Sequence, residues 1–308
     1  MGFDSHFKIS TCCASFFPYF FYFDHPKSMK NDRPSPLHLE GISGSLRVLL
    51  RKPLPLFLVL FYFLTKGGYS QATEPFQAPF NTMVLQEVAS MPTEGGYSAG
   101  NLATHALQRA VLTTRDHLEV DPRLAMPSYC SGATYLVFLK VISALLSANR
   151  MELSPAMIAE LRPSGQPDGA GVWGRWNANG PGTARLFREL ALGSNFTDLA
   201  EAQPGDFLKI FWNEAIGASE HGHSVIYLGT ERRNGIQTVS FWSSNVPGGF
   251  GRKTVPLSRV RRMIFSRLTH PYNLANLPLL PRSDNYLASL QLRNGTVHEM
   301  EFQCGLER

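Results

Sequence analysis

Apolar residues recur along the chain with two different spacings, which divide it into a helical part and a later strand-rich part. Three- and four-residue spacing over 81–91 and 98–113 predicts two helices with one apolar face each. From Ser131 to Arg150 the sequence is apolar on nearly all sides, which predicts a buried helix. Shorter helices are expected over 183–192 and near 285–292.

The second part of the chain has the pattern of an antiparallel sheet. Strands are predicted over 202–212, 222–230, 235–245 and 259–268. The second and third strands meet at Asn234-Gly235, a strong β-hairpin signal. Residues 162–182 are rich in Gly, Pro and Asn and are expected to form a loop. Helices followed by antiparallel strands predict an α+β fold with the helices on one side of the sheet.

Residues 1–72 have the pattern of a leader. Basic residues precede the apolar run 53–64, and Ser70 and Ala72 follow it as small residues two positions apart. These are the parts of a secretory signal peptide, so we expect a secreted or periplasmic protein. An uncleaved leader would instead attach the protein to a membrane through residues 53–64. The segment is long for a leader, and we expect translation to start downstream, at Met29 or near Leu46.

The positive charge of the chain is concentrated in that leader. Of the formal charge of +5, residues 1–72 contribute +4, with eight Lys/Arg against four Asp/Glu. Residues 73–308 are therefore close to neutral. The charge gives no reason to expect a nucleic-acid partner.

Cys130 lies where a turn becomes the long apolar helix. At a helix N-terminus the unpaired N–H groups and the helix dipole favour a thiolate and can hold an oxyanion. The small residues Ser131 and Gly132 let a substrate backbone approach closely. Cys130 is therefore a candidate nucleophile; the alternatives are buried packing and a disulfide with Cys304, which would exclude that role. Cys304 lies in a polar tail that we expect to be frayed.

A reactive thiolate requires a base, and His223 is the best placed histidine. It opens a core strand and shares a strand face with Val225 and Tyr227. His221, two residues earlier, is the competing candidate. The pair His221 and His223 also allows a metal-site interpretation, but no third ligand is evident, and we expect no metal.

The imidazole also requires an orienting partner, and the next strand ends in Ser243, Ser244 and Asn245. A strict two-residue turn at Asn234-Gly235 places Ser244 on the face of His223. One extra residue, or a β-bulge, places Asn245 there instead. The sequence leaves this choice open.

Four segments occur in the order found in the NlpC-like and CHAP-type papain-fold cysteine hydrolases: "YCSGATYLVF", "AQPGDFLKI", "HSVIYLG" and "SFWSSN". The chain resembles those families over about 126–245. The resemblance implies a papain-like domain over 73–270, with 271–308 as a C-terminal extension. It implies Cys130 as nucleophile, His223 as base and Asn245 or Ser243 as orienting residue, with no cofactor.

The resemblance and the leader together imply an exported cysteine peptidase or amidase that cleaves amide bonds, with cell-wall peptidoglycan peptides as the partner. Tyr129 stands where NlpC-like members often have Asp, which leaves the substrate open. The candidate substrate-binding residues are Tyr129, Ser131, Trp173, Trp176 and Trp242. The alternatives are a non-catalytic wall- or glycan-binding protein and an amidase or acyltransferase with a non-wall substrate.

Overall fold

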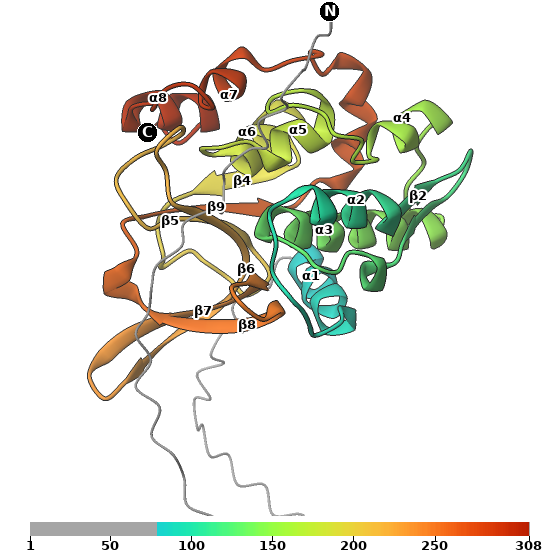
Figure 1. Cartoon of the computed structure of the whole chain (residues 1–308). Helices are drawn as coiled ribbons and strands as arrows, with labels where there is room; N and C mark the ends of the chain where they lie inside the picture. Colours follow the sequence, from blue (N-terminus) through green and yellow to red (C-terminus); the bar gives the residue numbers. More distant parts are fainter. Residues whose placement is uncertain (1–78, 308) are drawn as a thin grey trace, which may run out of the picture. The chain divides into compact units, whose positions relative to one another are not determined.

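The structure, a computed structural model, describes residues 79–307, which belong to one compact unit (Figure 1). The helices are α1 (Pro79–Ser90), α2 (Asn101–Ala110), α3 (Cys130–Ser147), α4 (Pro155–Glu160), α5 (Gly171–Asn177), α6 (Gly182–Glu189), α7 (Asn285–Ser289) and α8 (Val297–Cys304). Short 3-10 helices are η1 (Pro122–Leu124), η2 (Leu257–Arg259) and η3 (Pro271–Leu279). The predicted leader, including the apolar run 53–64, lies outside the described residues.

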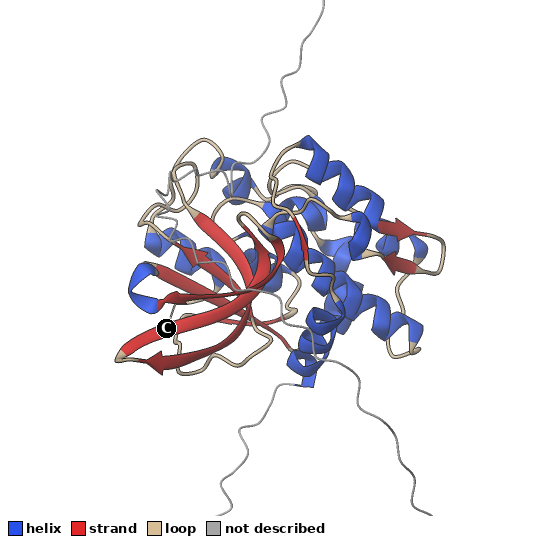
Figure 2. Cartoon of the chain, turned by 60° about the horizontal axis from the view of Figure 1, so that its bottom comes forward, coloured by secondary structure: helices blue, strands red, loops and turns tan. Residues whose placement is uncertain are grey.

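The strands form one large antiparallel sheet and a separate small hairpin. They are β1 (Glu94–Gly95), β2 (Val111–Thr113), β3 (Leu118–Val120), β4 (Gly193–Phe196), β5 (Phe207–Phe211), β6 (Gly222–Arg233), β7 (Ile236–Asn245), β8 (Gly249–Pro256) and β9 (Arg262–Leu268). The large sheet has the order β1-β8-β7-β6-β5-β9-β4, and β2 pairs with β3. The unit combines several helices with this large antiparallel sheet (Figure 2), so the predicted α+β class is confirmed.

The two faces of the sheet contribute to different apolar cores because side chains alternate along a strand. On one face, which we call the helix face, Ile226 and Trp242 belong to the core that includes most of α3. On the other, the far face, Val225, Tyr227 and Phe241 form a second core. The pleat therefore assigns each residue near the start of β6 to one core or the other.

Helix α3 is the central helix of the unit. The buried residues Val137, Phe138 and Ile142 show no exposed surface, and the helix packs against both β6 and β7. It is long and apolar enough to cross a membrane by length and composition, but most of it is buried inside the protein. The predicted buried helix is therefore correct, although it ends at Ser147 and not at Arg150.

Two parts of the chain differ in local structure from what the sequence predicted. Residues 162–182, expected as a loop, contain α5 and the start of α6, because Val172, Trp173 and Trp176 pack into the core and hold a helix despite the glycines. Strand β8 was missed. Its middle, Arg252 to Thr254, is exposed and polar, so it lacks the continuous apolar signal of a core strand.

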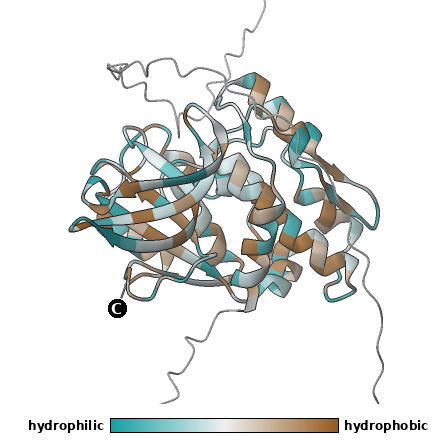
Figure 3. Cartoon of the chain, turned by 90° about the horizontal axis from the view of Figure 1, so that it is seen from below, coloured by the Kyte–Doolittle hydropathy of each residue, from teal (hydrophilic) through white to brown (hydrophobic). Residues whose placement is uncertain are grey.

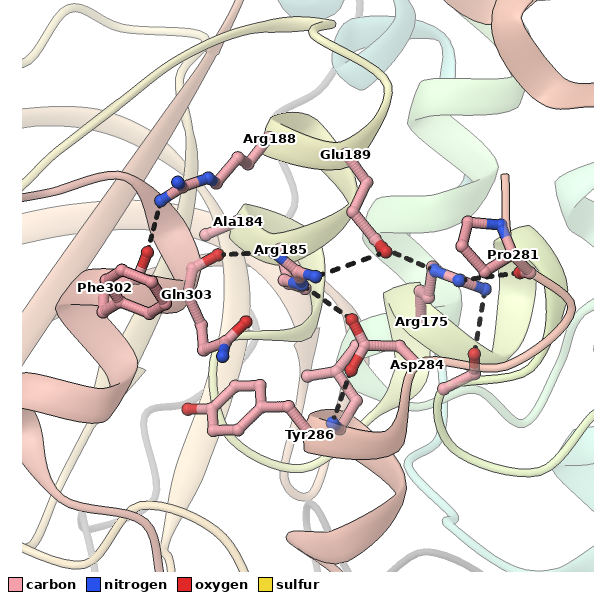
Figure 4. A network of polar contacts seen from close by, with 12 residues as sticks. Arg175, Ala184, Arg185, Arg188, Glu189, Pro281, Asp284, Tyr286, Phe302 and Gln303 are labelled. Atoms are coloured by element: carbon pink, nitrogen blue, oxygen red, sulfur yellow. Dashed lines mark hydrogen bonds and ion pairs between the residues drawn. The ribbon is translucent and has the colours of Figure 1, made fainter. Parts of the chain in front are cut away.

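The C-terminal segment is also better ordered than expected. Cys304 ends α8 and is buried, so the tail is not frayed there. Figure 4 shows the polar contacts that hold this segment: Arg175 donates to Glu189 at 2.6 Å, and Arg185 donates to Asp284 at 2.6 Å. Arg175 is fully buried and also donates to the carbonyl of Pro281 at 2.8 Å. These contacts join α5 and α6 to the residues that follow 270.

Candidate functional site

Cys130 is the first residue of α3, as the sequence predicted. Tyr129 before it is extended, and the cysteine is fully buried. Cys130 is disulfide-bonded. Cys304 is a free cysteine, so the predicted alternative of a Cys130–Cys304 disulfide is wrong. A nucleophilic role therefore requires prior reduction of this disulfide.

His223 and Asn245 form a hydrogen-bonded pair on neighbouring strands. His223 Nε2 lies 3.1 Å from Asn245 Oδ1. The Asn245 amide nitrogen donates to the carbonyls of Ser243 at 3.1 Å and Gly251 at 2.8 Å. Those two bonds fix the amide orientation, so its oxygen must accept from His223. The imidazole therefore carries its proton on Nε2, and Nδ1 keeps the lone pair that a base requires.

A β-bulge decides which residue faces His223. Asn234 and Gly235 both have positive φ, 50° and 78°, as the predicted two-residue hairpin turn requires. Near that turn Gly229 pairs with Ser240, but Ile226 pairs with Trp242, because the register shifts between Tyr227 and Gly229. The shift brings Asn245, and not Ser244, opposite His223. This is one of the two registers that the sequence left open.

The other two candidates for the orienting position have different partners. Ser243 Oγ donates to the carbonyl of Ser224 at 2.7 Å. Ser244 Oγ accepts from Ser128 Oγ at 2.8 Å, and both side chains are buried. Ser128 lies two residues before Cys130, so this bond holds the start of α3 against the end of β7 that carries Asn245. The sequence analysis missed Ser128, because a serine in a turn carries no distinctive signal.

The ring of His223 lies on the far face of the sheet. It contacts Phe241 edge to face at 5.6 Å between ring centroids, and Trp212 lies 6.4 Å away. Val225 and Tyr227 share this face, as predicted from the alternation. Cys130 approaches from the helix-face side, where α3 packs. The pleat therefore places His223 on the face opposite the one on which α3 packs. The bond between Ser128 and Ser244 is the contact that joins the start of α3 to the end of β7.

The surroundings of His223 favour a neutral imidazole. Burial lowers its pKa from 6.5 to about 4, more than the Asn245 hydrogen bond raises it. The positive charges of Lys253 and Lys209 lower it further. With Cys130 held in a disulfide, no thiolate charge offsets these effects. A thiolate near the ring would raise the pKa of His223.

The structure buries the three tryptophans that the sequence analysis named as substrate-binding candidates. Trp173, Trp176 and Trp242 are 3%, 1% and 6% exposed and pack in the core that contains α3. Trp242 stacks on Phe250 with centroids 5.8 Å apart, so little ring surface is left for a ligand. These three rings are therefore part of the apolar core.

Tyr129 and Ser131 are also buried beside Cys130. The Tyr129 ring contacts Trp173 at 6.4 Å, and burial raises the pKa of its hydroxyl to about 12. Ser131 Oγ donates to Asn177 Oδ1 at 2.6 Å. That bond links the first turn of α3 to the end of α5. Both side chains therefore shape the start of α3 and offer little surface to a substrate.

Within residues 79–307, no group of three or more His, Cys, Asp or Glu side chains is arranged to hold a metal ion. His221 is exposed, whereas His223 is half-buried and bonded to Asn245. The candidate site therefore rests on Cys130, His223 and Asn245. Comparisons of the chain with family models, with curated proteins and with solved structures find no match.

Proposed function

We propose that the reduced protein is an exported thiol hydrolase that cleaves amide bonds, with peptidoglycan peptides as its substrate class. The observation that carries this proposal is the His223–Asn245 pair, because the amide orientation leaves Nδ1 of His223 as the basic nitrogen. The Ser128–Ser244 bond supports it by holding the start of α3 next to that pair. A papain-like fold is part of the same proposal.

In the proposed reaction Cys130 attacks the carbonyl carbon of the amide as a thiolate. His223 Nδ1 receives the thiol proton and returns it to the nitrogen of the leaving amine as the C–N bond breaks. The N–H of Cys130, at the start of α3, donates to the oxyanion. Water, deprotonated by His223, then hydrolyses the thioester and restores the thiol. Asn245 keeps the imidazole in the reactive tautomer.

The disulfide makes this activity depend on redox state. A disulfide sulfur cannot act as the thiolate nucleophile, so a dithiol reductant must first reduce the bond, giving two thiols while the reductant becomes a disulfide. We expect no hydrolysis by the oxidised protein. We expect hydrolysis after reduction.

The test is release of soluble peptides from purified peptidoglycan by the full chain, with and without dithiothreitol. The reduced wild type should release new amino termini, and Cys130→Ala should not. Product masses identify the bond that is cleaved and separate wall peptides from other amides. Activity that survives in Cys130→Ala contradicts the proposal.

A second function is favoured by the disulfide itself. If Cys130 is a structural cysteine, the protein binds wall material without cleaving it. This alternative predicts that sedimentation with peptidoglycan is equal for the wild type and Cys130→Ala and that no product is released under reducing conditions. Because Trp173, Trp176 and Trp242 are buried, these three rings offer little surface to a glycan.

A further inference from the structure

One long stretch of the chain carries only positive charge. From Arg232 to Ser283 the sequence contains nine Lys or Arg and no Asp or Glu. Three of these cations pair with acids outside the stretch or at its edge, Arg233 with Glu231, Arg262 with Glu214 and Arg267 with Asp206. In the described part of the chain, Arg252, Lys253, Arg259 and Arg261 have no ion-pair partner.

Side chains alternate along β8, so Arg252 and Lys253 lie on opposite faces of the sheet. Arg252 pairs with Trp242, which lies on the helix face. Lys253 pairs with Phe241, which lies on the far face and contacts the ring of His223. Lys253 is therefore the unpaired cation that shares the face of His223. Both side chains are exposed. Figure 3 shows hydrophilic and hydrophobic segments alternating along the strands of the large sheet.

The electrostatics agree with that placement. The charge of Lys253 lowers the pKa of His223, so the two groups interact. Burial and the charge of Arg259 lower the pKa of Lys253 itself. Two cations that repel each other, and that form no ion pair with an acid among residues 79–307, favour the binding of an anion.

We propose that Lys253 is a specificity-determining residue that binds a carboxylate of the substrate on the far face, beside His223. The proposal rests on the proposed hydrolase function and narrows its substrates to amides with a negative charge near the cleaved bond. A lysine ammonium binds a carboxylate as a point charge. A neutral substrate of the same shape does not offset the repulsion between Lys253 and Arg259, so we expect it to bind more weakly.

The experiment compares two synthetic peptides that differ by one side chain, Glu or Gln, next to the susceptible amide. Hydrolysis by the reduced full chain gives the ratio of kcat/KM for the two peptides. Binding to Cys130→Ala, followed by tryptophan fluorescence, gives a second ratio that does not require catalysis. We expect the wild type to prefer the Glu peptide about tenfold, and the preference to fall as salt is added.

Matched variants decide the role of Lys253. Lys253→Met should abolish the preference, and Lys253→Arg should keep most of it. Arg252→Met removes the same charge one position away on the opposite face and should keep the full preference. A preference that survives Lys253→Met, or that is lost equally in Arg252→Met, overturns the proposal.

The hydrolysis and binding measurements together show whether the anion site and the hydrolase function fail separately. Binding that prefers the Glu peptide and is lost in Lys253→Met, without hydrolysis by the reduced wild type, supports the anion site and contradicts the hydrolase. Hydrolysis at equal rates for both peptides supports the hydrolase and contradicts the anion site.

Discussion

Burial of His223 makes the stability of the protein depend on pH. Its folded pKa of about 4 is below the ordinary value of 6.5, so the unfolded chain binds the proton more readily than the folded protein. The stabilisation is fully present above pH 6.5 and is lost as the pH falls towards 4. At about 1.4 kcal/mol per pH unit, the difference between the two pKa values corresponds to about 3 kcal/mol of unfolding free energy.

Urea unfolding of the wild type and His223→Gln between pH 4 and 7 measures this contribution. Other groups titrate in both proteins, so the difference between the two curves isolates His223. The destabilisation caused by the substitution should shrink by about 3 kcal/mol from pH 7 to pH 4. His221→Gln is the matched control, because His221 is exposed, and it should leave the pH dependence unchanged. Parallel curves for the wild type and His223→Gln would refute the reasoning.

Two further predictions concern the fold. Glu189→Ala leaves the buried Arg175 without its carboxylate and should cost about 3–5 kcal/mol in urea unfolding, whereas Asp121→Asn, in an exposed pair, should cost less than about 1 kcal/mol. Gly205→Ala should cost about 2 kcal/mol or more, because Gly205 has φ +97° and an added Cβ would lie 2.6 Å from the carbonyl oxygen of Asn81. A loss below about 1 kcal/mol for either Glu189→Ala or Gly205→Ala would contradict its explanation.

The sequence predicted the features that depend on neighbouring residues. Continuous apolar character identified α3, and alternation identified β6 and assigned His223 to the face of Val225. The Asn234-Gly235 turn was identified because those residues tolerate positive φ. Each of these features is set by residues that are neighbours in the sequence, so a local sequence pattern is enough to predict it.

The features that depend on distant contacts could not be predicted. The bulge that brings Asn245 opposite His223 lies at Leu228, next to Gly229, whose φ is 135°. A glycine inside a strand is a local signal for a bulge, but it does not fix the register that follows. The burial of Trp173 and Trp176 depends on α3 and β5, which lie far away in the sequence. The polar contacts of Arg175 with residues beyond 270 likewise form only in the folded chain.

The central claim is that Cys130 and His223 act together, and alkylation of Cys130 by iodoacetamide tests it most directly. The reduced full chain is alkylated between pH 5 and 10, and mass spectrometry reports the fraction modified at Cys130. In the wild type the reaction should stay fast well below pH 8.5, because the helix N-terminus and the imidazolium lower the pKa of the thiol. His223→Ala should move the profile towards pH 8.5, and His221→Ala should not. A wild-type profile of an ordinary thiol, unchanged in His223→Ala, would contradict the account.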